Sequence, residues 1–215
     1  MNHPNIEKCF YHNDKGVPVE GFLDDKNECK ILFVLKEPNT ELAEEFWFKK
    51  GVDQCGKGAK RYFHILGKIA AKILDRSGDL DNDDFLQSVL KECAYINLYP
   101  IKGEISASDD YKKVLELLEN TESDSIEINK KCNHNEIASN RKYLIENINC
   151  DYIVTVWDIF DKIIKEESRS NGIKYDGKWF KKGEFSGKPV YYFYHPSYPP
   201  ISYKKLEEIK INKQS

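Results

Sequence analysis

Three side chains of types common in active sites lie next to short apolar runs that are far apart in the sequence. Glu37 lies just after one run, Asn97 lies at the end of a second, and His195 follows a third. A carboxylate can orient water and stabilise positive charge, and an imidazole can donate to an oxygen that becomes negative. An amide offers a donor and an acceptor that can recognise a planar ligand. Together these groups would suit cleavage of a bond that separates charge.

The apolar runs predict the sheet that must position these side chains. Helical patterns of apolar residues lie between the runs, so the alternation predicts a three-layer α/β/α domain with a central four-stranded, mostly parallel sheet. Ligands of such sheets bind beyond the carboxyl ends of the strands, so we expect Glu37, Asn97 and His195 to share one rim. The runs are short and rich in β-branched or aromatic residues, and they cover residues 30–35, 93–98, 151–156 and 189–194.

Two segments fall outside this alternation. Glycines alternate with aromatic residues between positions 172 and 187, a pattern that predicts a β-hairpin insertion. Residues 1–29 are poorly patterned and are interpreted as an N-terminal lead-in or edge segment. Residues 30–215 then form a single α/β domain, which is an ordinary size for one domain.

Composition narrows the class of protein. The chain has 215 residues, of which 40% are hydrophobic, enough for a sizeable core. No apolar run approaches the roughly 20 residues that span a bilayer, and the N-terminus has no apolar signal-peptide core, so we expect a cytoplasmic protein. The six cysteines lack C-x-x-C spacing. We therefore expect reduced thiols, no metal cluster and no cofactor.

The ordered motifs resemble the uracil-DNA glycosylase superfamily. Glu37-Pro38 after the first strand, Asn97 at the end of the second and His195-Pro196-Ser197 after the last follow the order of that family. Residues 136–156 are similar to a helix and strand of its bacterial and archaeal branches, and the resemblance extends over about residues 30–205. It implies a DNA glycosylase that hydrolyses the N-glycosidic bond of uracil or another deaminated base flipped out of DNA.

The resemblance also implies roles for the three polar residues. Glu37 would be the catalytic carboxylate near the sugar, and His195 would donate to the oxygen of the departing base. Asn97 would recognise the base edge. Each residue also has a structural alternative: Glu37 as a solvated carboxylate paired with Lys36, Asn97 as a turn residue, and His195 as a partly buried imidazole bonded to a backbone carbonyl.

Further contacts are expected from the loops beyond the strands. Asn39 stands where the best-known branch has a tyrosine that excludes the thymine methyl, so strict uracil specificity is not expected. Phe48 is the candidate stacking ring, with core packing as its alternative. Ser197 would bind a phosphate or cap a helix, and Tyr198 or Ile201 would fill the gap in the duplex. The candidate DNA contacts are therefore Ser197, Tyr198, Lys102 and Lys36.

Charge is unevenly distributed along a chain whose formal net charge is −3. Six basic residues and one acid lie between positions 49 and 68, whereas eight acids lie between 104 and 127. This pattern predicts one basic face that could bind a polyanion, and ordinary solvated helix faces are the alternative. Two other functions stay open: a non-catalytic nucleic-acid or nucleotide binding module on the same fold, and a hydrolase of free nucleosides. We expect a monomer.

Overall fold

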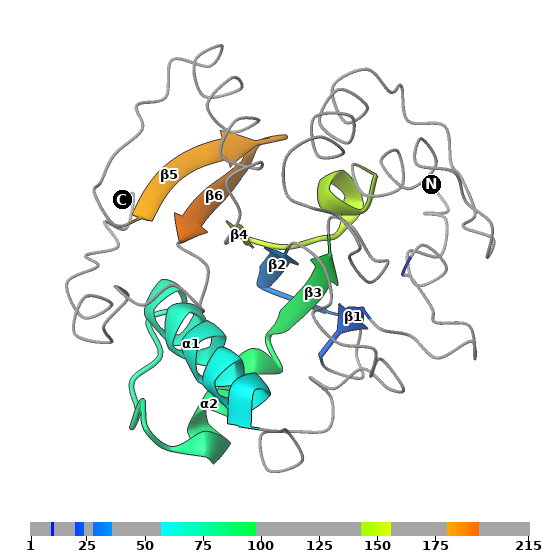
Figure 1. The fold of residues 1–215 in the computed structure, drawn as a ribbon. Helices are drawn as coiled ribbons and strands as arrows, with labels where there is room; N and C mark the ends of the chain where they lie inside the picture. The colour runs from blue at the N-terminus through cyan, green and yellow to red at the C-terminus, as the bar shows by residue number, and fades with distance from the viewer. Residues whose placement is uncertain are drawn as a thin grey trace.

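The computed structural model describes residues 10, 20–23, 28–35, 57–97, 143–155 and 180–193 (Figure 1). Within this part, the chain is a mixed α/β structure with one six-stranded sheet. The α/β prediction is thus confirmed. The elements, in chain order, are β1 (Gly21–Phe22), β2 (Ile31–Leu35), α1 (Lys57–Ile73), α2 (Asp83–Leu90), β3 (Cys93–Asn97), β4 (Tyr152–Thr155), β5 (Phe180–Phe185) and β6 (Lys188–Phe193).

The sheet has the strand order β1-β3-β2-β4-β6-β5. Strand β2 pairs in parallel with β3 and β4, and β4 pairs in parallel with β6. Strands β1 and β5 add one antiparallel strand to each edge, so the sheet is mixed and larger than the four strands expected. Each of the four predicted strands is present, with ends that differ from the predicted positions by at most one residue.

A tight hairpin joins the last two strands. Its turn residues, Ser186 and Gly187, have φ angles of 50° and 76°. Positive φ at both positions is the signature of a type I′ turn, whose twist matches that of paired strands. In its described part, the predicted hairpin insertion over 172–187 contributes strand β5, which pairs with β6 and extends the main sheet. Residues 172–179 lie outside the described part.

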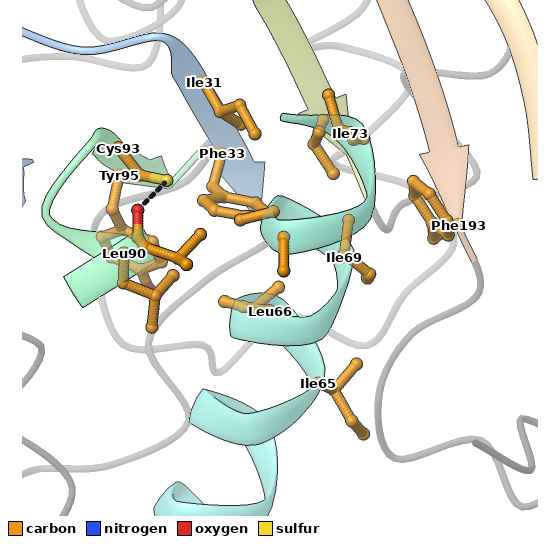
Figure 2. Close-up of a cluster of buried hydrophobic side chains, with 14 of the residues drawn as sticks. Ile31, Phe33, Ile65, Leu66, Ile69, Ile73, Leu90, Cys93, Tyr95 and Phe193 are labelled. Atoms are coloured by element: carbon orange, nitrogen blue, oxygen red, sulfur yellow. Dashed lines mark hydrogen bonds between the residues drawn. The ribbon is translucent and has the colours of Figure 1, made fainter. Parts of the chain in front are cut away.

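Both faces of the central strand β2 are buried. Ile31, Phe33 and Leu35 face a core formed with α1 and α2, whereas Leu32 and Val34 face a second core. Figure 2 shows the first core, where Phe33 meets Leu66 and Ile69 of α1. The helical residues 143–147 contribute Leu144 and Ile145 to the second core. A strand covered on both faces reads as a continuous apolar run, which is why residues 31–35 are uniformly hydrophobic.

The helices α1 and α2 pack closely on one another. A Cβ placed on Gly67 of α1 would lie 3.0 Å from the Cβ of Leu86 of α2, so the close approach depends on the glycine. Helix α2 begins after Asn82, whose side-chain oxygen accepts a hydrogen bond from the backbone N–H of Phe85 at 2.9 Å. No helix in the described residues is long and apolar enough to cross a membrane.

The carboxylate of Glu92 connects three elements at the amino edge of the parallel strands. Glu92 precedes β3, and it accepts hydrogen bonds from Arg76 Nε at 2.8 Å and Nη2 at 2.6 Å. Lys30, just before β2, donates its Nζ to Glu92 Oε2 at 2.5 Å and its backbone N–H to the Glu92 carbonyl at 2.7 Å. The Arg76 guanidinium, aided by Lys30 and opposed by burial, lowers the pKa of Glu92 to about 2.

We predict that Glu92→Gln lowers the free energy of unfolding at pH 7 by about 1 kcal/mol, after allowance for solvent screening. Because the pKa of Glu92 is lower in the folded state, its contribution is complete above the unfolded pKa of about 4.5. It disappears as the pH falls toward 2. Urea unfolding of both proteins from pH 7 to pH 2.5 measures the difference. Glu28→Gln is the matched control, because Glu28 is exposed. A difference that stays constant with pH would contradict the role given to this carboxylate.

Candidate functional site at the carboxyl edge of the sheet

The parallel strands end at one edge of the sheet. Leu35 at the end of β2 is in register with Asn97 at the end of β3, and Thr155 at the end of β4 is in register with Val34. From β2, the chain proceeds to β3 on one side and then to β4 on the other. The helices α1 and α2 cover one face, and residues 143–147 lie on the opposite face. The strand order therefore reverses between β2 and β4, which is where open α/β sheets bind ligands.

Asn97 is held in a fixed orientation at this edge. Its side chain is buried, with 1% exposure, and its Oδ1 accepts a hydrogen bond from the Tyr95 hydroxyl at 2.9 Å. The backbone N–H of Asn97 donates to Glu20 Oε1 at 3.0 Å, and Glu20 is itself buried. Burial raises the pKa of Tyr95, so its hydroxyl remains a donor at neutral pH.

Thr155 is a second polar side chain at the same edge. It is fully buried, and its hydroxyl has no hydrogen-bond partner among the described residues. Along β4, Ile153 contacts the core on the face of residues 143–147, and Thr155 lies two residues further on the same face. Tyr95 belongs to the opposite core, beneath α1, and Asn97 bonds to it. Asn97 and Thr155 therefore share the edge but lie on opposite faces of the sheet.

Sequence reasoning missed Glu20 and Thr155. Glu20 belongs to a segment whose sequence shows no pattern, and only the pairing of β1 with β3 brings it beside Asn97. Thr155 had a visible signal, because it is a polar residue near the end of an apolar run. A hydroxyl is common in strands, however, so the residue type alone does not separate it from a packing residue.

Two of the lysines of α1 are paired with aspartates of the segment that follows the helix. Lys60 Nζ lies 2.6 Å from Asp83 Oδ2, and His64 Nε2 lies 2.6 Å from Asp83 Oδ1. Lys68 Nζ lies 2.6 Å from Asp81 Oδ1. Lys60 holds the pKa of Asp83 below its usual value, and Lys68 does the same to that of Asp81. The interpretation of Lys60 and Lys68 as part of a polyanion-binding face is therefore not supported.

Of the predicted site residues, Asn97 alone lies in the described part of the chain, at the edge where it was expected. The described residues contain no group of three His, Cys, Asp or Glu side chains that could hold a metal ion. The predicted residues that lie outside the described part are Glu37, His195, Asn39, Phe48, Ser197, Tyr198, Lys102 and Lys36.

Known families do not identify the protein. The sequence matches no family model. It also matches no curated protein. A function is therefore inferred from the residues and from the sheet that carries them.

We predict that Thr155→Val leaves the free energy of unfolding unchanged or raises it by up to about 1 kcal/mol. The reason is that a buried hydroxyl without a hydrogen bond costs free energy, and a methyl group of the same shape does not. Thr155→Ser is the matched control: it keeps the hydroxyl, loses a methyl group, and should lower stability by about 1 kcal/mol. Urea unfolding measures both. A loss above 1 kcal/mol for Thr155→Val would reveal a stabilising hydrogen bond.

Proposed function

We propose that the protein is a DNA glycosylase that hydrolyses the N-glycosidic bond of uracil or another deaminated base in DNA. The proposal includes a three-layer α/β/α domain with four parallel strands at its centre. The observation that carries it is the parallel pairing of β3, β2, β4 and β6. This pairing supports a common edge for the residues that follow these strands, because Glu37 comes two residues after β2 and His195 two residues after β6.

The three residue types match the charge that develops in this reaction. When the bond between base and deoxyribose breaks, positive charge builds on the sugar and negative charge on the base. The Glu37 carboxylate would stabilise the sugar and orient the attacking water. His195, as a neutral imidazole, would donate a hydrogen bond to the base oxygen that becomes negative. Asn97 would recognise the flipped base through its amide.

The surroundings of Asn97 support its role in recognition. Its side chain is already oriented by the Tyr95 hydroxyl, and its backbone by the Glu20 carboxylate. A recognition group whose rotamer is fixed before binding loses little conformational entropy when the ligand arrives. A side chain that recognises a base is expected to be held by such hydrogen bonds. A residue in a surface turn does not need them.

We expect the protein to release a free base and leave an abasic site in oligonucleotides that carry uracil, hypoxanthine, xanthine or a thymine mismatch. Glu37→Gln and His195→Ala should each lower kcat/KM by about 10²- to 10⁴-fold, the usual effect of losing a charge-stabilising or proton-transferring group. Glu28→Gln, at an exposed position, is the matched control and should retain full activity. Wild-type protein that leaves the whole panel intact would rule out the proposal. If the protein shifts these oligonucleotides on gels at low salt but cleaves none of them, the non-catalytic binding module becomes the better explanation.

A second candidate is the same hydrolysis on a free nucleoside. The pairing of Lys60 with Asp83 and of Lys68 with Asp81 favours it, because these pairs neutralise two of the cations that pointed to a polyanionic substrate. The difference between the two substrates is the phosphate backbone. DNA releases counterions when a basic protein binds it, and a neutral nucleoside does not.

We therefore predict that activity on DNA depends on salt. With as few as two phosphate contacts, kcat/KM on a uracil oligonucleotide should fall about tenfold between 50 and 200 mM salt. Turnover of deoxyuridine, measured in the same buffers, is the internal control and should change little. Faster turnover of deoxyuridine than of the oligonucleotide at every salt concentration would favour the nucleoside hydrolase.

A cytoplasmic location is part of the proposal. Cys29, Cys93 and Cys150 are all free thiols in the structure. Buried and half-buried thiols that remain unlinked are typical of proteins kept in a reducing compartment.

A further inference from the structure

Two cysteines lie side by side at the amino edge of the sheet, opposite the candidate site. Cys29 lies two residues before β2, and Cys150 lies two residues before β4. The two strands are parallel neighbours. Just beyond the cysteines, the carbonyl of Lys30 accepts hydrogen bonds from the backbone N–H groups of Asp151 at 2.9 Å and Tyr152 at 3.0 Å. The backbone pairing therefore continues to the residues next to both cysteines.

The two side chains also meet. Cys150 is buried in the core on the face of residues 143–147, and half-buried Cys29 packs against the same cluster. The Cys29 thiol donates to the carbonyl oxygen of Asn149, the residue before Cys150, at 3.6 Å. Neighbouring strands lie about 4.8 Å apart, which is within the Cα separation of about 4.4 to 6.8 Å found across disulfides. The backbones thus need little movement for the two sulfurs to bond.

The electrostatics of the pair make the two thiols unequal. The neighbouring Cys150 thiol, with burial, raises the pKa of Cys29. The neighbouring Cys29 thiol lowers the pKa of Cys150, and Lys188 lowers it further, whereas burial and Asp151 oppose the shift. Cys150 is therefore the better nucleophile of the two.

We propose that Cys29 and Cys150 are a redox-active dithiol pair that forms a reversible disulfide between the starts of β2 and β4. The oxidant is hydrogen peroxide. The Cys150 thiolate attacks one peroxide oxygen, the O–O bond breaks, and a sulfenic acid forms. The departing hydroxide takes up the proton that the Cys150 thiol had released, which gives the first water. The Cys29 sulfur then attacks the sulfenic sulfur, the S–S bond forms, and the departing hydroxide takes the Cys29 proton as a second water. Overall, the two thiols lose two electrons, and one hydrogen peroxide is reduced to two waters.

Cys93 provides an internal comparison. It is buried in the opposite core, beneath α1 and α2, and its thiol donates to the Val89 carbonyl at 3.7 Å. Burial raises the pKa of Cys93. It should therefore neither react with peroxide nor pair with Cys29.

The test is thiol counting and peptide mapping on the full-length protein, before and after treatment with stoichiometric hydrogen peroxide. The wild type should fall from six titratable thiols to four in denaturant. Mass spectrometry should then find one cross-linked peptide pair that contains Cys29 and Cys150, and dithiothreitol should restore all six thiols. Cys93→Ala should also lose two thiols, whereas Cys29→Ser and Cys150→Ser should form no intramolecular disulfide.

A second measurement does not depend on whether the variants fold. The oxidised wild type should unfold at a temperature higher by roughly 5 to 10 °C, because the disulfide closes a long loop in the unfolded chain. An unchanged or lower melting temperature would overturn the proposal. So would a cross-link between other cysteines, or Cys29 and Cys150 that remain unlinked at peroxide levels that oxidise other thiols. None of these outcomes depends on the glycosylase proposal.

Discussion

The described fold depends on the burial of strand β2. All five of its residues are buried and apolar, and the strand is paired in parallel on both sides. A parallel strand in this position needs cover on both faces, and each buried side chain of this kind contributes about 1.5 to 3 kcal/mol to the hydrophobic free energy. The helices α1 and α2 on one face and residues 143–147 on the other supply that cover. The same arrangement makes the carboxyl end of β2 the point where the strand order reverses.

Strands that are themselves rich in apolar residues could be predicted from the sequence. Strands that form mainly because a neighbouring segment pairs with them could not. The strands β2, β3, β4 and β6 have enough β-branched or aromatic residues to be recognised in isolation. Strand β1 has two residues, which are too few to show the alternation of apolar and polar side chains that is typical of a strand. The sequence of β5, FKKGEF, is mostly polar because it is an edge strand, and its pairing follows from the turn at Ser186 and Gly187.

The candidate site shows the same division. Asn97 could be predicted because an amide ends an apolar strand. The carboxylate of Glu20 could not, since it reaches Asn97 through a pairing between segments that are far apart in the sequence. The ion pairs of α1 could not be predicted for a related reason. The lysines at positions 60 and 68 are close in sequence to other cations, but their aspartate partners arrive only with α2 and the turn before it.

The ammonium group of Lys188, in the β5–β6 hairpin, bonds to the end of the helix at residues 143–147, about forty residues earlier in the chain. Its Nζ donates to the carbonyl oxygens of Ile145 at 2.9 Å, Glu146 at 2.6 Å and Ile148 at 2.9 Å. Carbonyls at the end of a helix have no partner within the helix, so this side chain acts as a C-terminal cap delivered from β6. During synthesis, the helix is complete before its cap has been made. Its last turn and the hairpin should therefore become ordered together, late in folding, as one cooperative unit.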